Sequence, residues 1–451
     1  MKVKSVSALL VAILAVVIAA SQASGATTWT VDQSTGTNNC AGNICKTISK
    51  AVQKAAAGAT IVVDPGTYSE SVNVTKKLTI KASRKAPDLL TCNDNRTDAD
   101  PATFAIIEPP QGYPGFSLQA AGITIDGFII QNADNTVQNV LGGGVGIFTS
   151  PSFSGYVIQN NLFQDNSAGI YLGSSGTTTV SGNCFRDNNN GFGFAPIAGD
   201  GIYSDMGLKS ASISQNHFWD HQSDDLVLTG STVNPTVVTT TVSGNISGSS
   251  AGFLTVLLSK GTVVSSNIIK NTTDSSSDDS AAILFWGTNT AFSIKSNIIQ
   301  NGAGNGIEFD QINGLSGSGS YPPLYDGPNT GGTVSSNIVQ QMGFDGLYAA
   351  DYGVFGATTN SLEKTLVNNN IFGNEGDDGI HIAKQSAVTF TITTKNTFTG
   401  NIASNNPVHD CHESNNKDVW TGNTNIGHRV NKTGLCFPGD VVTGPQNHPS
   451  N

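Results

Sequence analysis

The stretch Val180–Phe185, with the sequence VSGNCF, decides the fold because near-copies of it recur along the chain. Each copy has an aliphatic residue followed three positions later by asparagine, and most copies continue with one residue and then Phe, Ile or Val. A fixed phrase that returns every 22 to 40 residues is typical of a stacked repeat. The clear copies end at Asn161, Asn183, Asn216, Asn245, Asn267, Asn297, Asn337 and Asn370, a weaker echo ends at Asn396, and a last copy that begins with Trp420 ends at Asn423.

The residues of the repeat predict a coil of short strands. Aliphatic residues alternate with Gly, Asn, Asp and Ser, which favour turns, so each repeat supplies strands and the corners between them. Asparagines at the same place in successive coils can form a ladder, in which each side-chain amide bonds to the next across a strand spacing of about 4.8 Å. We therefore expect the repeat asparagines to be scaffold residues.

The N-terminal part of the chain predicts a capped first coil. Residues 47–57 form the one convincing helical pattern, with its apolar side chains on one face. Such a helix would cover the open end of a solenoid, whose first coil otherwise exposes its core and an unpaired backbone edge. Short strands are predicted over 28–31, 60–68, 72–74 and 78–80, and the last three segments make one complete coil.

This N-terminal pattern resembles that of right-handed parallel β-helix proteins of the pectate-lyase-like superfamily. The matching segments are Ala51–Val52, Ile61–Val63, Pro65–Tyr68 and Leu78–Ile80. The resemblance implies an all-β protein, a right-handed parallel β-helix of about ten coils over residues 27–436 with a short capping helix. Proteins of this superfamily include lyases, hydrolases, esterases, epimerases, tailspikes and proteins without a known reaction, so the resemblance does not select an activity.

The N-terminal residues predict export. Lys2 and Lys4 precede an apolar run over 8–20 and small residues at 24–26, so residues 1–26 are predicted to be a signal peptide. The run is too short to span a membrane comfortably, and no second run follows. We expect a monomer that is secreted or held at the cell surface. Residues 437–451 are rich in Pro, Gly and Asn and are predicted to form a disordered tail.

The formal net charge of −11 argues against nucleic acid or anionic membranes as partners, because both require basic surfaces. Export permits disulfides among the six cysteines. We expect Cys40 to pair with Cys45 and Cys411 to pair with Cys436, which would fasten the two ends of the solenoid. Cys92 and Cys184 have no partner nearby in sequence, and Cys184 is a candidate for a free, buried thiol.

A second repeated pattern, the second register, follows the asparagine phrase in most coils and predicts a surface column. It is three residues long, for example Gly-Ile-Tyr at 169–171. Its middle residue is always Ile or Leu and should face the core, so the next residue should face outward. The predicted outward column consists of Tyr171, Tyr203, Val227, Leu284, Glu308, Tyr348 and His381. A polysaccharide lying along such a face would meet one outward side chain per coil.

The polar end of this column has the side chains for two kinds of polysaccharide cleavage. In β-elimination from a uronic acid polymer, a base removes a proton and an acid protonates the leaving oxygen, for which Tyr348, His381 and Lys384 have suitable groups. In hydrolysis, two carboxylates flank the bond, for which Glu308 with Asp310 or Asp351 would serve. The predicted catalytic residues are Glu308, Tyr348, His381 and Lys384.

Other residues near the column are candidates for binding. The rings of Tyr171 and Tyr203, and of Tyr321 and Tyr325 in a Gly/Ser-rich insertion over 311–332, could stack on sugars. Asp310 and Asp351 could hold a cation, with calcium the expected ion, to neutralise a substrate carboxylate. The turn before the second register is also acidic, and calcium could lie between its carboxylates: Asp200, Asp224, Asp345 and Asp378.

Two short segments carry metal-ligand side chains without a clear pattern. They are His217–His221 and His409–Glu413, and in the second the disulfide is the better use of Cys411. The sequence therefore predicts an exported β-helix that binds or cleaves a polysaccharide. The alternative is a non-catalytic adhesion or structural protein, which should present a flat, repetitive face without convergent acid and base groups.

Overall fold

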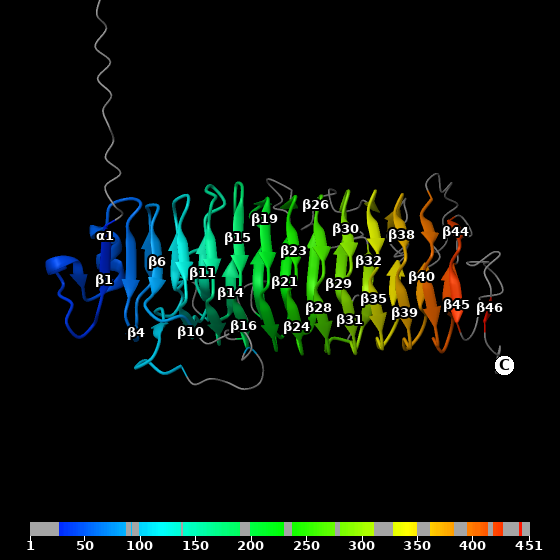
Figure 1. The fold of residues 1–451 in the computed structure, drawn as a ribbon, viewed down its shortest axis with the longest axis horizontal. Coiled ribbons are helices and arrows are strands. Elements are labelled where there is room, and N and C mark those ends of the chain that lie inside the picture. The colour runs from blue at the N-terminus through cyan, green and yellow to red at the C-terminus, as the bar shows by residue number, and fades with distance from the viewer. Residues whose placement is uncertain are drawn as a thin grey trace, which may run out of the picture.

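The computed structural model describes residues 27–86, 92, 99–136, 139–189, 199–229, 237–275, 280–310, 328–349, 361–382, 395–413, 418–426 and 442–443. Their strands stack side by side into one long column, with helix α1 (Ile48–Lys54) at its N-terminal end (Figure 1). Every pairing between these strands is parallel, and each strand away from the ends of its long sheet has one neighbouring strand on either side. The predicted parallel β-helix is confirmed.

Each complete coil contributes one strand to each of three long sheets. The first sheet contains, in spatial order, β2 (Ile44–Cys45), β1 (Thr28–Val31), β3 (Thr60–Val63), β6 (Thr79–Ala82), β9 (Thr124–Asp126), β12 (Val157–Gln159), β15 (Thr178–Ser181), β19 (Ala211–Ser214), β23 (Thr241–Ser243), β27 (Val263–Ser265), β30 (Ser293–Lys295), β34 (Thr333–Ser335), β38 (Leu366–Asn368), β41 (Thr397–Thr399) and β44 (Val419–Thr421).

The second sheet contains β4 (Gly66–Tyr68), β7 (Ala105–Ile107), β10 (Ile129–Gln131), β13 (Leu162–Gln164), β16 (Cys184–Arg186), β20 (His217–Trp219), β24 (Ile246–Gly248), β28 (Ile268–Lys270), β31 (Ile298–Gln300), β35 (Ile338–Gln340), β39 (Ile371–Gly373), β42 (Ile402–Ser404), β45 (Thr424–Ile426) and β46 (Val442–Thr443). Strand β46 lies in the segment for which the sequence predicts a disordered tail, and it pairs with β45.

The third sheet contains β5 (Val72–Val74), β8 (Phe116–Leu118), β11 (Val145–Thr149), β14 (Ala168–Tyr171), β17 (Asp200–Ser204), β21 (Asp224–Thr229), β25 (Gly252–Leu257), β29 (Ala281–Trp286), β32 (Asn305–Asp310), β36 (Leu347–Ala349), β40 (Ile380–Ile382) and β43 (Cys411–Glu413). Two small sheets complete the described strands: β18 (Leu208–Lys209), β22 (Val237–Val238) and β26 (Ser259–Lys260) form one, and β33 (Asn329–Thr330) and β37 (Leu362–Glu363) form the other.

The core is a set of in-register columns inside the three sheets. Every middle residue of the first sheet pairs with its equivalent in the next coil, for example Ile158 with Val180 and Val180 with Ile213, and all three are buried. In the second sheet the rings of Phe163, Phe185 and Phe218 stack at centroid distances of 4.7 and 4.9 Å. Burial of these columns is the main stabilising contribution to the fold.

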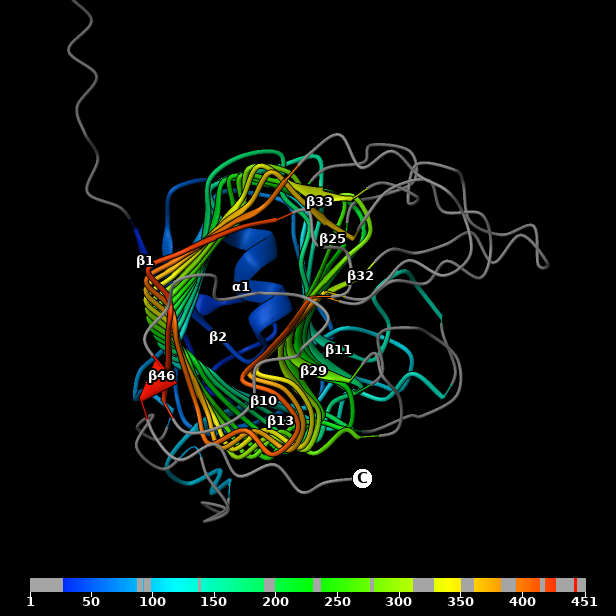
Figure 2. The same ribbon diagram turned by 90° about the vertical axis from the view of Figure 1, so that its right-hand side faces the viewer.

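Helix α1 closes the N-terminal end of the column, as Figure 2 shows in the view along the axis. The helix begins after Thr47, whose side chain accepts a hydrogen bond from the backbone N of Lys50, and it ends before Ala55, whose backbone is extended. The Glu70 carboxylate accepts from the first two backbone N–H groups of α1, at 2.8 and 2.9 Å, where a negative charge favours the helix. The helix is shorter than the predicted 47–57.

The repeat asparagines form the predicted ladder. Asn183 is representative: its Oδ1 accepts from the backbone N and the Nδ2 of Asn161, and its Nδ2 donates to Asn216 Oδ1 and to the Ile158 carbonyl. The ladder is fully buried and runs without a break from Asn161 to Asn423.

One member of the ladder differs from the prediction. The rung between Asn370 and Asn423 is Asn401, not Asn396, because Phe398 takes the place of the aliphatic residue and hides the phrase. Asn396 lies in a different turn, where its Oδ1 accepts from the backbone N of Thr365 and its own backbone N donates to Asp418.

The cysteines differ in part from the prediction. Cys40 and Cys45 are bridged as expected, but Cys92 and Cys184 pair with each other, so the predicted free thiol is wrong. Cys92 and Cys184 are buried in a small cluster, separate from the main core, with Ile106, Ile129 and Leu162 of the second sheet. Cys411 is disulfide-bonded, and its expected partner Cys436 lies outside the described residues. No helix among the described residues is long and apolar enough to cross a membrane.

We predict that Asn267→Ala lowers the free energy of unfolding by roughly 3 kcal/mol or more, because Asn267 is fully buried and four hydrogen bonds of the ladder depend on its side chain. The matched control is Ser265→Ala on the half-buried outer side of the same strand, which should change the stability by less than about 0.5 kcal/mol. Thermal unfolding checks both variants. Equal unfolding temperatures for the two would contradict a stabilising ladder.

Candidate functional site

The third sheet carries the predicted outward column, and its register is confirmed. Strand pairing aligns the following residues in successive coils: Asn73, Ser117, Phe148, Tyr171, Tyr203, Val227, Thr255, Leu284, Glu308, Tyr348, His381 and His412. The predicted column lacked five of these residues, which are Asn73, Ser117, Phe148, Thr255 and His412. Thr255 was missed because Phe253 stands where most coils have glycine, and His412 because Cys411 stands where most coils have Ile or Leu.

The stretch of this outward column from Phe148 to Tyr203 is aromatic and buried. The rings of Phe148, Tyr171 and Tyr203 pack edge to face at 5.6 Å, and each tyrosine exposes only 7% of its surface. Both tyrosine hydroxyls donate to Asp205. Burial, followed by this hydrogen bond, raises the pKa of Tyr171. The rings therefore present little surface for the sugar stacking that the sequence predicts for them.

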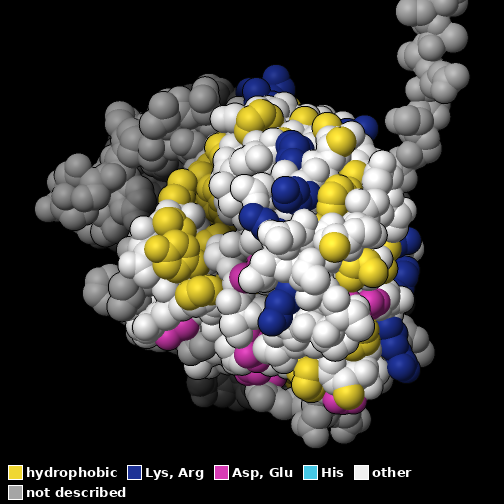
Figure 3. All heavy atoms as spheres, turned by 90° about the vertical axis from the view of Figure 1, so that its left-hand side faces the viewer, with side chains coloured by type: hydrophobic (Ala, Val, Ile, Leu, Met, Phe, Trp, Pro, Cys, Tyr) yellow, Lys and Arg dark blue, Asp and Glu magenta, His cyan; other side chains and the backbone are white. Residues whose placement is uncertain are grey.

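A hollow of about 600 Å³ lies beside Phe148. Tyr113, Val140 and Leu141 line it and are exposed, Leu141 by 60%. The view onto the N-terminal end shows hydrophobic side chains gathered on one flank of the molecule (Figure 3). This hollow contains apolar surface but few groups that exchange protons.

Glu308 and Asp310, both predicted for the hydrolytic mechanism, are buried. Glu308 is fully buried, and its Oε2 accepts a hydrogen bond of 2.9 Å from Asn305 Nδ2. Asp310 exposes 3% of its surface. Four further predicted site residues lie outside the described residues: Lys384, Tyr321, Tyr325 and Asp351.

The C-terminal coils bring together a group of side chains that we call the Asp–His cluster, which consists of Asp345, Asp378, His381, His409 and His412. Asp345 and Asp378 lie at the same turn of successive coils, as the backbone hydrogen bonds from Gly306 to Asp345 and from Gly346 to Asp378 show. The sequence predicts an acidic turn here but does not reveal that three histidines converge on it.

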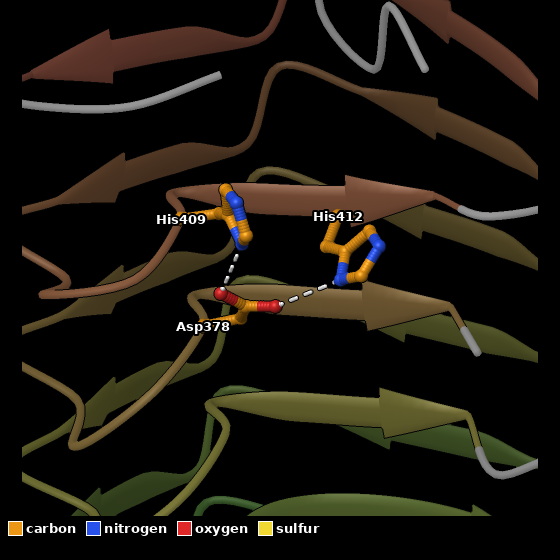
Figure 4. Close-up of side chains that lie close together, drawn as sticks. All are labelled: Asp378, His409 and His412. Atoms are coloured by element: carbon orange, nitrogen blue, oxygen red, sulfur yellow. Dashed lines mark hydrogen bonds and ion pairs between the residues drawn. The ribbon is translucent and has the colours of Figure 1, made fainter. Parts of the chain in front are cut away.

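Asp378 lies at the centre of the Asp–His cluster. Its Oδ1 is 2.9 Å from His409 Nδ1, and its Oδ2 is 3.3 Å from His412 Nδ1 and 3.8 Å from His381 Nδ1. His409 and His412, both from the following coil, each contact one oxygen of the Asp378 carboxylate (Figure 4). The Asp378 side chain is 2% exposed, whereas the three imidazoles are 22 to 27% exposed.

Asp345 supports His381 from the preceding coil. Its Oδ2 is 3.0 Å from His381 Nδ1, and its Oδ1 accepts from the backbone N of Asp378 at 2.8 Å. Burial raises the pKa of Asp345, although the hydrogen bond with His381 opposes this. Burial alone would lower the pKa of His381, but the hydrogen bond and the charges of Asp345 and Asp378 outweigh it, so the net shift is upward.

The outer surface of the Asp–His cluster is a row of rings. Tyr348 and His381 lie 5.2 Å apart between ring centroids, and His381 stacks on His412 at 4.6 Å. These groups can exchange protons with a molecule lying on the sheet. Two overlapping sets of side chains also have the donor atoms to hold a cation, with all ligand atoms of a set within 4.8 Å of one another: Asp378 with His409 and His412, and Asp345 with Asp378 and His381.

Earlier coils carry a second acidic group at the same turn. A hollow of about 400 Å³ is lined by Asp224, Asp274 and Thr255 among others, and burial raises the pKa of Asp224 to about 7. His221, the nearest histidine in sequence, is fully buried and pairs with Asp225 at 2.7 Å. We therefore place the candidate site at the Asp–His cluster, where imidazoles reach the surface.

The pH dependence of stability offers a test of the buried acids near the cluster. Glu375 is 2% exposed, and burial raises its pKa from 4.5 to about 8 although it accepts from the backbone N of Met342 and Gly373. Between these two values the folded chain holds a proton that the unfolded chain has released. The free energy of unfolding should therefore fall as the pH rises through this window.

We predict that Glu375→Gln removes this pH-dependent contribution, so between pH 4.5 and about 8 the stability difference shifts toward the variant by at most about 5 kcal/mol. A pH-independent cost of about 1 to 3 kcal/mol accompanies it, because the glutamine Nε2 cannot accept the backbone hydrogen bond that one carboxylate oxygen accepts. Thermal unfolding across this range measures the difference. Unfolding temperatures that change in parallel with pH for both proteins would show that Glu375 is already ionised in the folded chain.

The comparisons with known proteins agree with the fold. A family model described as periplasmic copper-binding protein (NosD) matches residues 106–306, a segment that ends before the Asp–His cluster. No curated protein matches the sequence. The chain is similar in structure to the catalytic unit of a thermostable GH87 alpha-1,3-glucanase from Streptomyces thermodiastaticus strain HF3-3, with a TM-score of 0.52, 11% identity, and coverage of 89% of this chain and 68% of the glucanase.

A second solved structure with the same architecture is the PL6 family alginate lyase AlyGC. Its TM-score is 0.51 at 10% identity, and the match covers 93% of this chain and 53% of the lyase, so this chain spans about half the length of that protein. At these identities the likeness establishes the parallel β-helix and no more.

Proposed function

We propose that the protein is a secreted or surface-held enzyme that cleaves a polysaccharide containing uronic acid by β-elimination, with its site at Tyr348 and the Asp–His cluster. The observation that carries the proposal is the row of Tyr348, His381 and His412 on three successive coils, backed by the buried carboxylates of Asp345 and Asp378. Titratable groups with shifted pKa values that lie side by side at a protein surface are typical of functional sites.

The shape of the face suits a linear polymer. Successive coils are about 4.8 Å apart, so a sugar chain lying along the column meets a new outward side chain with nearly every residue. The two solved structures of similar fold are described as an alginate lyase and an alpha-1,3-glucanase, both of which act on polysaccharides. The disulfides fit an oxidising compartment outside the cytosol.

His381 is the proposed acid and Tyr348 the proposed base. The Nδ1 of His381 is engaged by Asp345, which fixes the ring and leaves Nε2 for the substrate, as in other histidine–carboxylate pairs. In the reaction Tyr348, in its deprotonated form, takes the proton from the carbon next to the uronic carboxylate, a carbon–carbon double bond forms, and the bond to the leaving oxygen breaks. His381 then protonates that oxygen.

Elimination is favoured over hydrolysis by the burial of the acids. Hydrolysis requires two carboxyl groups that flank the sugar bond, yet Glu308 is fully buried and Asp310 is 3% exposed. Lys384 stays a further candidate for the elimination machinery, and calcium at Asp310 and Asp351 stays a proposal for holding the substrate carboxylate.

We predict that the purified chain releases products with the ultraviolet absorbance of unsaturated sugar ends from at least one polymer in a panel of acidic and neutral polysaccharides. Tyr348→Phe and His381→Ala should each reduce the rate by about 100-fold or more while the unfolding temperature stays near that of the wild type. The control is His217→Ala on β20 of the second sheet, which should retain full activity.

Three other results would change the proposal. Reducing sugar without new absorbance would mean hydrolysis and would return Glu308 and Asp310 to the centre of the mechanism. Binding without cleavage would favour an adhesion protein. Neither binding nor cleavage across the panel would favour a structural role for the column.

A further inference from the structure

We infer that Asp378, His409 and His412 form a binding site for one divalent transition-metal ion of the class that imidazole ligands favour, with zinc as the reference ion. The inference does not depend on polysaccharide cleavage. The site also lies outside residues 106–306, the segment that the family model matches.

The three ligands come from two successive coils and converge. Asp378 lies in the turn before β40, His409 in the turn before β43, and His412 within β43. Each residue offers one donor atom, and the three donor atoms lie within 4.8 Å of one another. The Nδ1 atoms of His409 and His412 are 2.9 and 3.3 Å from the two Asp378 oxygens. Figure 4 shows both imidazoles directed at the same carboxylate.

The donor set selects the class of ion. Calcium and magnesium prefer six or more oxygen ligands, whereas two imidazole nitrogens with one carboxylate suit zinc, copper or nickel. Three protein ligands also leave a coordination position open, as in zinc sites that bind water or a substrate. This separates the site from the calcium that the acidic turn alone would predict.

The surroundings hold the ligands in place before an ion arrives. The backbone N of Asp378 donates to Asp345 Oδ1, and the backbone N of Gly379 donates to the carbonyl of His409 at 2.9 Å, so the sheet itself fixes the spacing of the two coils. His412 stacks on His381. Such supporting contacts orient metal ligands and raise their affinity.

The ion can also reach the site. Asp378 is almost fully buried, so its charge needs a cation or several donors close by, while His409 and His412 expose 27% and 26% of their side chains. Without an ion the two Nδ1 atoms serve as hydrogen-bond donors to Asp378. An ion would take their place, with the Nδ1 protons moving to Nε2 or to solvent.

The test is a calorimetric titration of the chelator-stripped full chain with zinc chloride, and separately with calcium chloride. We expect one zinc per chain, bound at least 100-fold more tightly than calcium. His409→Ala and His412→Ala should each weaken zinc binding by about 10- to 100-fold. Asp378→Asn should do the same, and His217→Ala should leave the affinity unchanged. Cobalt in place of zinc should give a visible absorption band that the double variant His409→Ala/His412→Ala lacks.

Three results would overturn the site. They are the absence of zinc binding by the folded wild type, unchanged zinc affinity in a double variant that unfolds at the wild-type temperature, and tighter binding of calcium than of zinc. Because no sugar enters the titration, its failure and a failure of the proposed cleavage are told apart directly.

Discussion

The buried asparagine ladder is the constraint on which the rest of the structure depends. A corner of the coil places a left-handed residue directly before each rung, for example Gly182 before Asn183 and Gln215 before Asn216. Such a conformation is unfavourable for residues other than glycine, and the backbone groups around it would be unsatisfied inside the protein. The asparagine amides satisfy those groups and join each corner to the next. Because the corners stack without a break, every coil has the same register in all three sheets.

That shared register explains how the candidate site is assembled. Asp345, Asp378 and His409 are 31 to 33 positions apart in sequence, yet they occupy one turn of three successive coils. No local motif connects them. The site is built by stacking, which places residues of equivalent position against one another, and the pairing of buried carboxylates with partly exposed imidazoles then sets its electrostatics.

Structural features that repeat from coil to coil can be predicted from the sequence, whereas features that occur only once cannot. The strands, the cap and the outward column follow from a period that is visible in the residues. The Cys92–Cys184 bridge does not, because it joins residues 92 positions apart and Cys92 belongs to no repeat. The burial of Glu308 was equally hidden, since alternation along a strand gives the direction of a side chain but not what covers it. The Asp–His cluster needed the alignment of His412 with His381, which Cys411 disguised by replacing the usual Ile or Leu.

Because the coils stack in register, the distance between two groups on the outward column is a whole number of strand spacings. The aromatic part of the column at Phe148, Tyr171 and Tyr203 and the ionisable part at Tyr348, His381 and His412 are separated by a whole number of strand spacings of about 4.8 Å. Insertions at the corners change the loops and leave this separation untouched. Only the gain or loss of an entire coil can alter it, so the geometry of this face can evolve in steps of one sugar length but not continuously.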